Sequence, residues 1–439
     1  MSKRSRRNFL KQVGLGMAGA SVLQSYPTVG ATGANKKIVI GLIGCGGMGS
    51  KLLRSFASQK DVRVAYVCDV DSEHAEKGQK IVQDAADSTP KVVRDLRKVL
   101  DDRSVDAVVI GTPDHWHGPA TILACQAGKH VYVEKPGSHN IREGRLMIEA
   151  ARRHRRVVQV GTQSRSQPYL IRAMELLRDG AIGEILVAKA WNSQRRGNIG
   201  HVLPSEPPAH LDYDLWLGPT PFVPFKSNRF HGNWRWSYHF GTGDIGNDGV
   251  HDIDIARWGL GVDTHPSTVA ALGGKLYFDD DRDFPDTQYV AYEYPGDGKI
   301  GNKKQLIYEQ RDWSPYMQEG HENGDAFYGT EGMMILGKQS GWQLYGPRNK
   351  LRETMKGRIN DLHHHRDFLE AIRTGKTPNA DVGIHHLSAT LSHLGNIATR
   401  VGRVIHFNPK TEQVGGDDEA NALIRRTYRK GHWAVPEGV

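Results

Sequence analysis

Cysteine is scarce in this chain of 439 residues, which holds only Cys45, Cys68 and Cys125. A small, odd number of cysteines in a long chain excludes a disulfide framework of the kind that holds small secreted domains together. All three lie in the first third of the sequence. We therefore expect them to be buried thiols within one N-terminal domain.

Acidic residues are absent from the first 34 positions, which carry five lysines and arginines. Without these five, the formal net charge of the chain falls from +9 to +4. So small and scattered an excess does not favour binding to nucleic acid. Long apolar runs are also absent from the remainder of the chain, which predicts no membrane-spanning helix.

The first 34 residues have the organisation of an export signal. The segment 5–11 reads Ser-Arg-Arg-Asn-Phe-Leu-Lys, which matches the twin-arginine motif closely. A mildly apolar stretch at 12–25 is too short to span a membrane, and small residues at 29–34 offer a cleavage site. We predict that residues 1–34 are a twin-arginine signal peptide and that the protein is exported to the periplasm or its equivalent. The alternative is a basic tail on a cytoplasmic protein.

The strongest local signal follows a predicted buried strand at 36–43. The next six residues, from Gly44 to Gly49, form the pattern Gly-x-Gly-x-x-Gly and lead into a helix-like stretch. The first glycine allows a tight turn, the second lets the backbone approach a pyrophosphate, and the third lets helix and strand pack closely. The predicted contacts of this loop with a dinucleotide are Gly44, Cys45, Gly46, Gly47, Met48 and Gly49.

Asp69 ends the next predicted strand and lies 20 residues after Gly49. A carboxylate at this distance accepts hydrogen bonds from the ribose hydroxyls of NAD and repels the 2′-phosphate of NADP. The sequence therefore predicts NAD as the cofactor, with NADP less favoured.

Alternating strands and helices continue to residue 160. Strands are predicted at 62–67, 105–110, 130–133 and 157–160, and helices at 117–127 and 140–153. This order predicts a doubly wound parallel sheet, a Rossmann domain over residues 36–160, in which ligands bind beyond the carboxyl ends of the strands. Polar residues predicted at those ends are Asp69, Thr112, Lys135 and Gln163.

Three motifs at separate strand ends together resemble the Gfo/Idh/MocA oxidoreductases. They are the glycine loop, then Thr112-Pro113 with His117 four residues after the proline, then Glu134-Lys135-Pro136. The segments 241–258 and 361–403 also resemble the active-site helix and the closing helices of that family. The resemblance adds Pro113, His117 and Glu134 to the expected cofactor contacts, and Gln163 joins them by position.

This resemblance implies a second α/β domain with a large, mostly antiparallel open sheet, expected over residues 161–405 and followed by a C-terminal extension at 406–439. The open face of the sheet is expected to form a homodimer or homotetramer contact. The substrate is expected to be a sugar, cyclitol or related polyol. Lys135 is expected beside the nicotinamide and the reacting hydroxyl, preceding a peptide bond to Pro136 that is expected to be cis.

The segment 241–258 departs from the family pattern Asp-x-Gly-x-His at one position. Asn247 stands where the family has aspartate, whereas His251 matches the pattern, and the two share a face if the helix is continuous. An amide orients a hydroxyl but cannot take its proton, so we predict Lys135 and His251 as catalytic and Asn247 as substrate-orienting. Asp248 would point elsewhere on a continuous helix. Arg165 is a further predicted substrate contact by position, and a purely structural His251 is the alternative.

The aromatic residues and most of the histidines remain without an assigned role. Aromatic residues gather over 212–239, where they either stack on sugar rings or pack a loop core. The chain also has 21 histidines, but the adjacent ones lack the spacing of a helical zinc pair. We expect no metal, unless His231, His239 and His251 converge in the fold.

The residues favour NAD-dependent oxidation of a hydroxyl on a sugar, cyclitol or polyol, with hydride transfer to nicotinamide. One alternative is a redox-neutral enzyme with retained NAD, either a sugar–sugar oxidoreductase or an NAD-dependent glycosidase. Another is a non-catalytic sugar-binding protein on the same scaffold.

Overall fold

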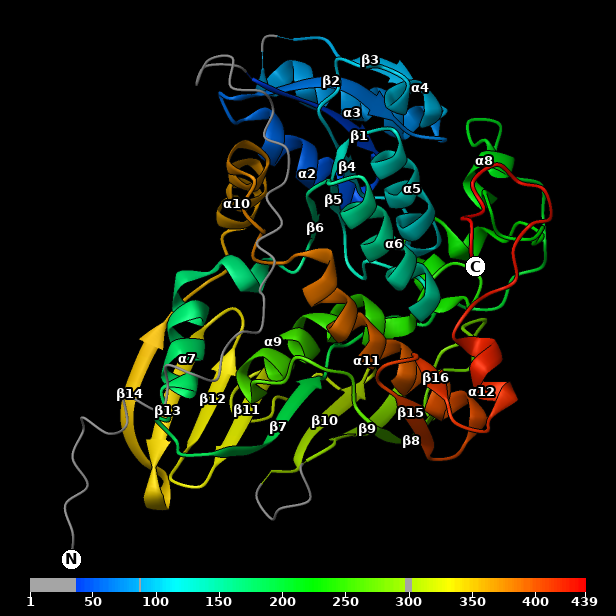
Figure 1. Cartoon of the computed structure of the whole chain (residues 1–439). Coiled ribbons are helices and arrows are strands. Elements are labelled where there is room, and N and C mark those ends of the chain that lie inside the picture. Colours follow the sequence, from blue (N-terminus) through cyan, green and yellow to red (C-terminus); the bar gives the residue numbers. More distant parts are fainter. Residues whose placement is uncertain (1–36, 87, 297–301) are drawn as a thin grey trace, which may run out of the picture.

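The computed structural model describes residues 37–86, 88–296 and 302–439. It contains two β-sheets, one above the other, with helices between and around them (Figure 1). The predicted signal peptide lies outside the described residues. No helix among the described residues combines the length and apolarity that crossing a membrane requires.

The N-terminal sheet has six parallel strands in the order β3-β2-β1-β4-β5-β6. Their bounds are β1 Ile38–Ile43, β2 Val62–Cys68, β3 Lys91–Val93, β4 Ala107–Ile110, β5 His130–Val133 and β6 Val158–Val160. The helices between them are α2 Gly47–Ala57, α3 Ser72–Ala85, α4 Arg97–Leu100, α5 Asp114–Gln126 and α6 Ile141–Arg153. The predicted doubly wound sheet is confirmed, and the three cysteines are free and buried within this region.

The second sheet has ten strands in the order β14-β13-β12-β11-β7-β10-β9-β8-β15-β16. β7 pairs in parallel with β10, and the other recorded pairs are antiparallel. The bounds are β7 Ile185–Asn192, β8 Thr268–Gly274, β9 Thr287–Tyr294, β10 Lys304–Arg311, β11 Asn323–Gly329, β12 Met333–Gly337, β13 Gly341–Gly346, β14 Lys350–Lys356, β15 Ile405–Asn408 and β16 Gln413–Val414. The expected mostly antiparallel sheet is therefore confirmed.

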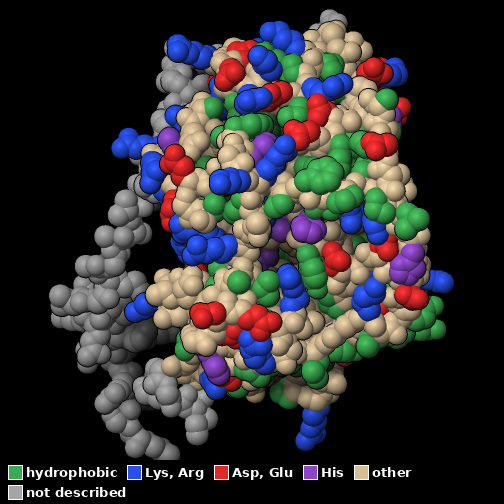
Figure 2. All heavy atoms as spheres, turned by 90° about the vertical axis from the view of Figure 1, so that its right-hand side faces the viewer, with side chains coloured by type: hydrophobic (Ala, Val, Ile, Leu, Met, Phe, Trp, Pro, Cys, Tyr) green, Lys and Arg blue, Asp and Glu red, His purple; other side chains and the backbone are tan. Residues whose placement is uncertain are grey.

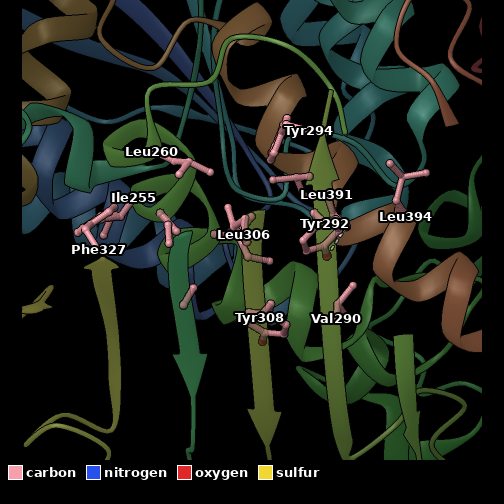
Figure 3. Packing of buried hydrophobic residues seen from close by; sticks show 14 of the residues in the cluster. Ile255, Leu260, Val290, Tyr292, Tyr294, Leu306, Tyr308, Phe327, Leu391 and Leu394 are labelled. Carbon is pink, nitrogen blue, oxygen red and sulfur yellow. Dashed lines mark hydrogen bonds between the residues drawn. The ribbon is translucent and has the colours of Figure 1, made fainter. Parts of the chain in front are cut away.

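Among the described residues, helices cover the face of this sheet that looks toward the Rossmann domain and leave the other face open (Figure 1). They are α7 Pro168–Arg178, α9 Val250–Leu260 and α11 Val382–Val401. Their apolar side chains meet inward-facing residues of β9, β10 and β11, such as Tyr292, Leu306 and Phe327, in one buried cluster (Figure 3). Along β9, buried residues alternate with more exposed ones such as Tyr289, as expected for a sheet with one covered face.

Segments from late in the chain also complete the Rossmann domain. α10, Asp361–Thr374, places Phe368 and Ile372 in the same buried cluster as Ile40 and Phe56 of the first strand and helix. A loop over 193–240, which holds α8 (Tyr213–Leu217), and a C-terminal tail over 425–439, which follows α12 (Asp418–Leu423), run along one side of the molecule (Figure 1). Short 3₁₀ turns lie at Gln163–Ser166, Ser227–Arg229, Asn233–Trp236 and Pro347–Asn349.

Candidate active site

A cavity of about 630 Å³ lies at the carboxyl edge of the six-stranded sheet. Its walls come from four parts of the chain: the strand ends of the Rossmann domain, the 193–240 loop, the turn before α9, and the C-terminal tail. This volume is typical of a site that encloses a small ligand or cofactor. The face over the cavity, where the loop and tail lie, mixes acidic, basic, hydrophobic and histidine side chains (Figure 2).

The glycine loop fits a dinucleotide phosphate. Gly44 has a φ of +88°, and an added Cβ would lie 2.7 Å from the backbone nitrogen of Thr112. An added Cβ at Gly49 would overlap the carbonyl oxygen of Gly44, so both positions demand glycine. Gly46 and Gly47 line the cavity with no atom crowding them, and they stand at the N-terminus of α2, where free N–H groups favour an anion. Cys45 and Gly49 support this loop without lining the cavity.

Asp69 is bonded directly to the glycine loop. Its Oδ2 accepts a hydrogen bond from the Cys45 N–H at 2.6 Å, and its Oδ1 accepts one from the Asp71 N–H at 2.9 Å. Burial raises the pKa of the Asp69 carboxyl, while these two N–H groups oppose that shift. The carboxylate lines the cavity beside the loop, as the ribose-binding role requires.

The predicted residues after β4 and β5 also line the cavity, namely Thr112, Pro113, His117, Glu134 and Lys135. The His117 ring lies between two carbonyl oxygens, with Nε2 at 2.8 Å from that of Thr112 and Nδ1 at 2.6 Å from that of Pro136. Burial raises the pKa of Glu134 to about 7, and the neighbouring Lys135 ammonium partly offsets this. Among the described residues, Thr112 Oγ1 and Glu134 Oε1 are buried without a hydrogen-bond partner.

Lys135 joins the Rossmann domain to the segment before α9. Its Nζ donates to the carbonyl oxygen of Asn247 at 2.8 Å and lies 3.3 Å from Asn247 Oδ1. The peptide bond between Lys135 and Pro136 is cis, as the resemblance implied. The structure thus brings together two of the predicted substrate residues at one end of the cavity.

The segment Ile245–Gly249 is a π-helical turn rather than the start of a continuous α-helix. Successive residues in such a turn are separated by a smaller rotation, and π-turns are frequent at functional sites. Both Asn247 and Asp248 line the cavity. The expectation that Asp248 points elsewhere depended on a continuous helix, and the structure does not have one.

Asp248 is the main functional candidate that sequence reasoning missed. Its carboxylate accepts hydrogen bonds from Asn323 at 2.8 Å, Lys338 at 3.3 Å, Asn192 at 3.4 Å and Gln194. Burial raises the pKa of Asp248, but the Lys338 ammonium, together with Arg196 and Lys135, outweighs burial and holds the pKa below its usual range. Asp248 is therefore a fixed negative charge in the polar wall of the cavity.

His251 lies one turn beyond Asp248, on α9. Burial lowers the pKa of its imidazole well below the usual value, and the cations of Lys338 and Lys135 lower it further, whereas Asp248 raises it. The ring is therefore neutral at ordinary pH and able to accept a proton. His251 is half-buried and is not among the residues that line the cavity.

Two predicted contacts lie away from the cavity. Arg165 is buried, donates two hydrogen bonds to Asp254 at 2.7 and 2.8 Å, and lies over the ring of Trp258. Gln163 is buried, and its carbonyl oxygen accepts from Gln167. The structure places Arg165 in a domain-core ion pair rather than beside a substrate.

The aromatic segment serves two purposes. Tyr213, Phe225 and Phe240 form a buried cluster inside the 193–240 loop, whereas Trp216 and Trp234 reach the cavity.

Some of the described side chains are close enough together to hold a metal ion. They include Asp71, His74 and His231 in one group, and His265, His386 and Glu412 in another. Within the described part of the chain, His231 does not form such a group with His239 and His251.

Comparison with known proteins agrees with this arrangement. Residues 38–162 match the Gfo/Idh/MocA model described as an oxidoreductase family with an NAD-binding Rossmann fold, and residues 187–435 match the model of its C-terminal alpha/beta domain. The chain is 31% identical to "Inositol 2-dehydrogenase 2" of Saccharopolyspora erythraea, over 58% of this chain and 62% of that protein. It is 29% identical to a "Glycosyl hydrolase family 109 protein" of the same organism, over 42% of this chain and 44% of that protein. These alignments therefore span about half of each relative.

Among solved structures, a levoglucosan dehydrogenase in complex with NADH and levoglucosan has a TM-score of 0.64 to this chain. The identity is 20%, and the match covers 84% of this chain and 99% of that one. At this identity the likeness establishes a shared fold.

Proposed function

Because this chain belongs to the Gfo/Idh/MocA oxidoreductase family, we propose that it oxidises a hydroxyl group of a sugar, cyclitol or related polyol. One observation carries the proposal: Lys135 Nζ and Asn247 meet at one end of the cavity whose other parts fit a dinucleotide. Bound NAD would supply the hydride acceptor. The residues that would hold it are the glycine loop, Asp69, Thr112, Glu134 and Lys135.

The chain's own residues divide the remaining work. Lys135 Nζ donates toward an oxygen at the Asn247 end and stabilises negative charge that develops on a reacting hydroxyl. His251, neutral because burial and the Lys338 and Lys135 cations lower its pKa, accepts the hydroxyl proton through a water, since it does not itself line the cavity. Asn247 orients the hydroxyl. Asp248 is a positioning residue, since its charge favours the protonated form of His251.

The polar wall supports a polyhydroxylated substrate. Gln194 and Arg196 line the cavity next to Asn247 and Asp248, so amide, guanidinium and carboxylate groups face one small space. Such a wall offers both donors and acceptors to adjacent hydroxyls. The dehydrogenases among the relatives favour net dehydrogenation over the redox-neutral and non-catalytic alternatives.

The direct test is a substrate screen with the purified full-length protein. We expect NADH to form, followed at its absorbance band, when NAD is supplied with one of a panel of cyclitols, aldoses and anhydrosugars. NADP should support a much lower rate. If no polyol reduces NAD, and no ketose or inosose oxidises NADH, the proposed activity is wrong.

Coenzyme preference gives a second prediction. Asp69→Asn keeps an acceptor for the Cys45 N–H but removes the charge that repels a 2′-phosphate. The ratio of the Kd for NADP to the Kd for NAD should fall about 10- to 100-fold, the range expected when a hydrogen bond to a charged group is lost. Titration of both nucleotides measures it. Asp84→Asn, an exposed carboxylate on α3 outside the cavity, is the matched control. An unchanged ratio would remove Asp69 from ribose recognition.

Two wider features belong to this proposal. We infer that the uncovered face of the ten-stranded sheet pairs with a second copy of the chain, since it exposes Leu272 and Tyr289 on neighbouring strands. We also infer export by the twin-arginine route from the motif at residues 5–11, with a cytoplasmic location as the alternative. Export of a folded, cofactor-loaded enzyme suits that route.

A further inference from the structure

The order of the strands indicates which end of the cavity would hold the nicotinamide and which end the adenine. Lys135 follows β5, the glycine loop follows β1, Asp69 follows β2, and Arg94 to Leu96 follow β3, and all of them line the cavity. With Lys135 at the nicotinamide end and Asp69 at the adenosine ribose, the adenine lies toward the edge formed by Arg94, Asp95 and Leu96. The C-terminal tail packs against this edge, which follows β3.

Trp433 is the residue of the tail that lines the cavity. Its indole ring lies 4.4 Å from the Arg97 guanidinium carbon, on the helix that follows β3. It also packs 5.8 Å from the ring of Trp116, on the helix that follows β4. Trp433 thus bridges α4 and α5 at the adenine end, and its half-buried ring adds a flat apolar surface there.

The tail is fixed on the amino side of Trp433. Arg426 donates to Glu143 of α6 at 2.8 Å, to Thr220 of the 193–240 loop at 3.0 Å, and to the carbonyl oxygen of His115 on α5 at 2.7 Å. Beyond Trp433, the carbonyl oxygen of Gly438 accepts from Arg142 on α6 at 2.7 Å. A tail anchored on both sides holds the indole in place rather than leaving it in solvent.

The 193–240 loop, which lies on the same side of the molecule as the tail, forms a further wall of the cavity. The Asp212 N–H donates to the Val70 carbonyl at 2.9 Å, and the Ser72 N–H donates to the His210 carbonyl at 3.0 Å, which fixes the loop to the start of α3. His231 Nε2 lies 3.0 Å from Asp71, next to the ribose-binding Asp69. His231 and Trp234 line the cavity from this loop.

We propose that the C-terminal tail and the 193–240 loop form a nucleotide clamp, in which Trp433 contacts the adenine and slows the release of NAD. This inference rests on the proposed NAD-linked function. It gives the extension at the end of the chain a role in cofactor binding. The nucleotide leaves only when the anchors of the tail or the loop release.

The test measures nucleotide release rather than turnover. The full-length protein is loaded with NADH, mixed rapidly with excess NAD, and the loss of bound-NADH fluorescence gives the dissociation rate. We expect Trp433→Ala to raise this rate at least tenfold and Trp433→Phe to stay within about threefold of the parent, because a base stacks on either aromatic ring. Trp313→Ala, a tryptophan stacked on Tyr277 outside the cavity, is the control and should leave the rate unchanged.

The outcomes separate the two proposals. If the parent protein binds no NADH, the proposed function and the clamp both fail. If the parent binds NADH and Trp433→Ala releases it at the parent rate, the clamp alone is overturned. Should Trp433→Ala not fold, as judged by circular dichroism, Trp433→Leu replaces it, since leucine keeps apolar volume while losing the ring.

Discussion

Lys135→Ala should lower kcat by about three orders of magnitude while changing the Kd for NAD by no more than a few-fold. The Nζ atom stands at the meeting point of the Rossmann domain and the segment before α9, where it donates to Asn247. Removing it takes away the cation that stabilises charge on the reacting oxygen. The glycine loop, Asp69 and the other residues that would hold the nucleotide are untouched.

The measurement combines steady-state rates with an independent nucleotide titration. Lys77→Ala, an exposed lysine on α3, is the matched control and should behave like the parent. Near-normal turnover of the Lys135 variant would contradict its role in the reaction. Loss of NAD binding together with turnover would instead assign Lys135 mainly to the cofactor.

Asp248→Asn should lower kcat/KM about 100-fold and shift the acidic limb of the pH–rate profile to lower pH. The direction follows from His251, whose pKa is already lowered by burial and by Lys338 and is raised by the Asp248 charge. Without that charge, the imidazole becomes a weaker base and loses its proton at a lower pH. Activity is then retained further into acid, but at a reduced plateau.

A triple variant separates this catalytic effect from a loss of stability. Asp248→Asn leaves Lys338 paired with Asp252 alone, at 2.9 Å, and we expect about 2 kcal/mol of destabilisation, because a buried cation loses one of two partners. Adding Lys338→Met together with Asp252→Asn removes the cation and its remaining buried partner, and should recover most of the lost free energy of unfolding. We expect kcat/KM of the triple variant to stay at least tenfold below the parent. Parallel recovery of stability and activity would reduce Asp248 to a structural role.

The Rossmann half of the site could be predicted from sequence because its chemistry is local. The glycine loop, Asp69, Thr112 and Lys135 each follow a strand, and parallel strands bring their carboxyl ends to one edge. Arg165 was predicted to contact the substrate from its position in the sequence alone, without a motif to support that role. Its partner Asp254 lies far along the chain, and only the folded structure shows the ion pair.

Asp248 was missed for a different reason. On a continuous α-helix Asp248 would lie about 100° around the axis from Asn247, away from the face expected to bind substrate, and no residue type in the segment indicates a π-turn. Its donors come from β7, β11 and the end of β12, which sequence spacing does not relate to α9. Trp433 was also missed, because a tryptophan in a C-terminal tail belongs to no recognisable motif. Its contacts with Arg97 and Trp116 form only when distant parts of the chain come together in the fold.

The position of α10 bears on how the protein is made. Phe368 and Ile372 fill the same core as Ile40 and Phe56, more than three hundred residues earlier in the chain. Until α10 has been synthesised, the nascent Rossmann domain lacks this part of its core and leaves apolar side chains of β1 and α2 exposed. An excised fragment of residues 37–160 would expose the same side chains. The complete core of the nucleotide-binding domain therefore forms only after residue 374 has been made.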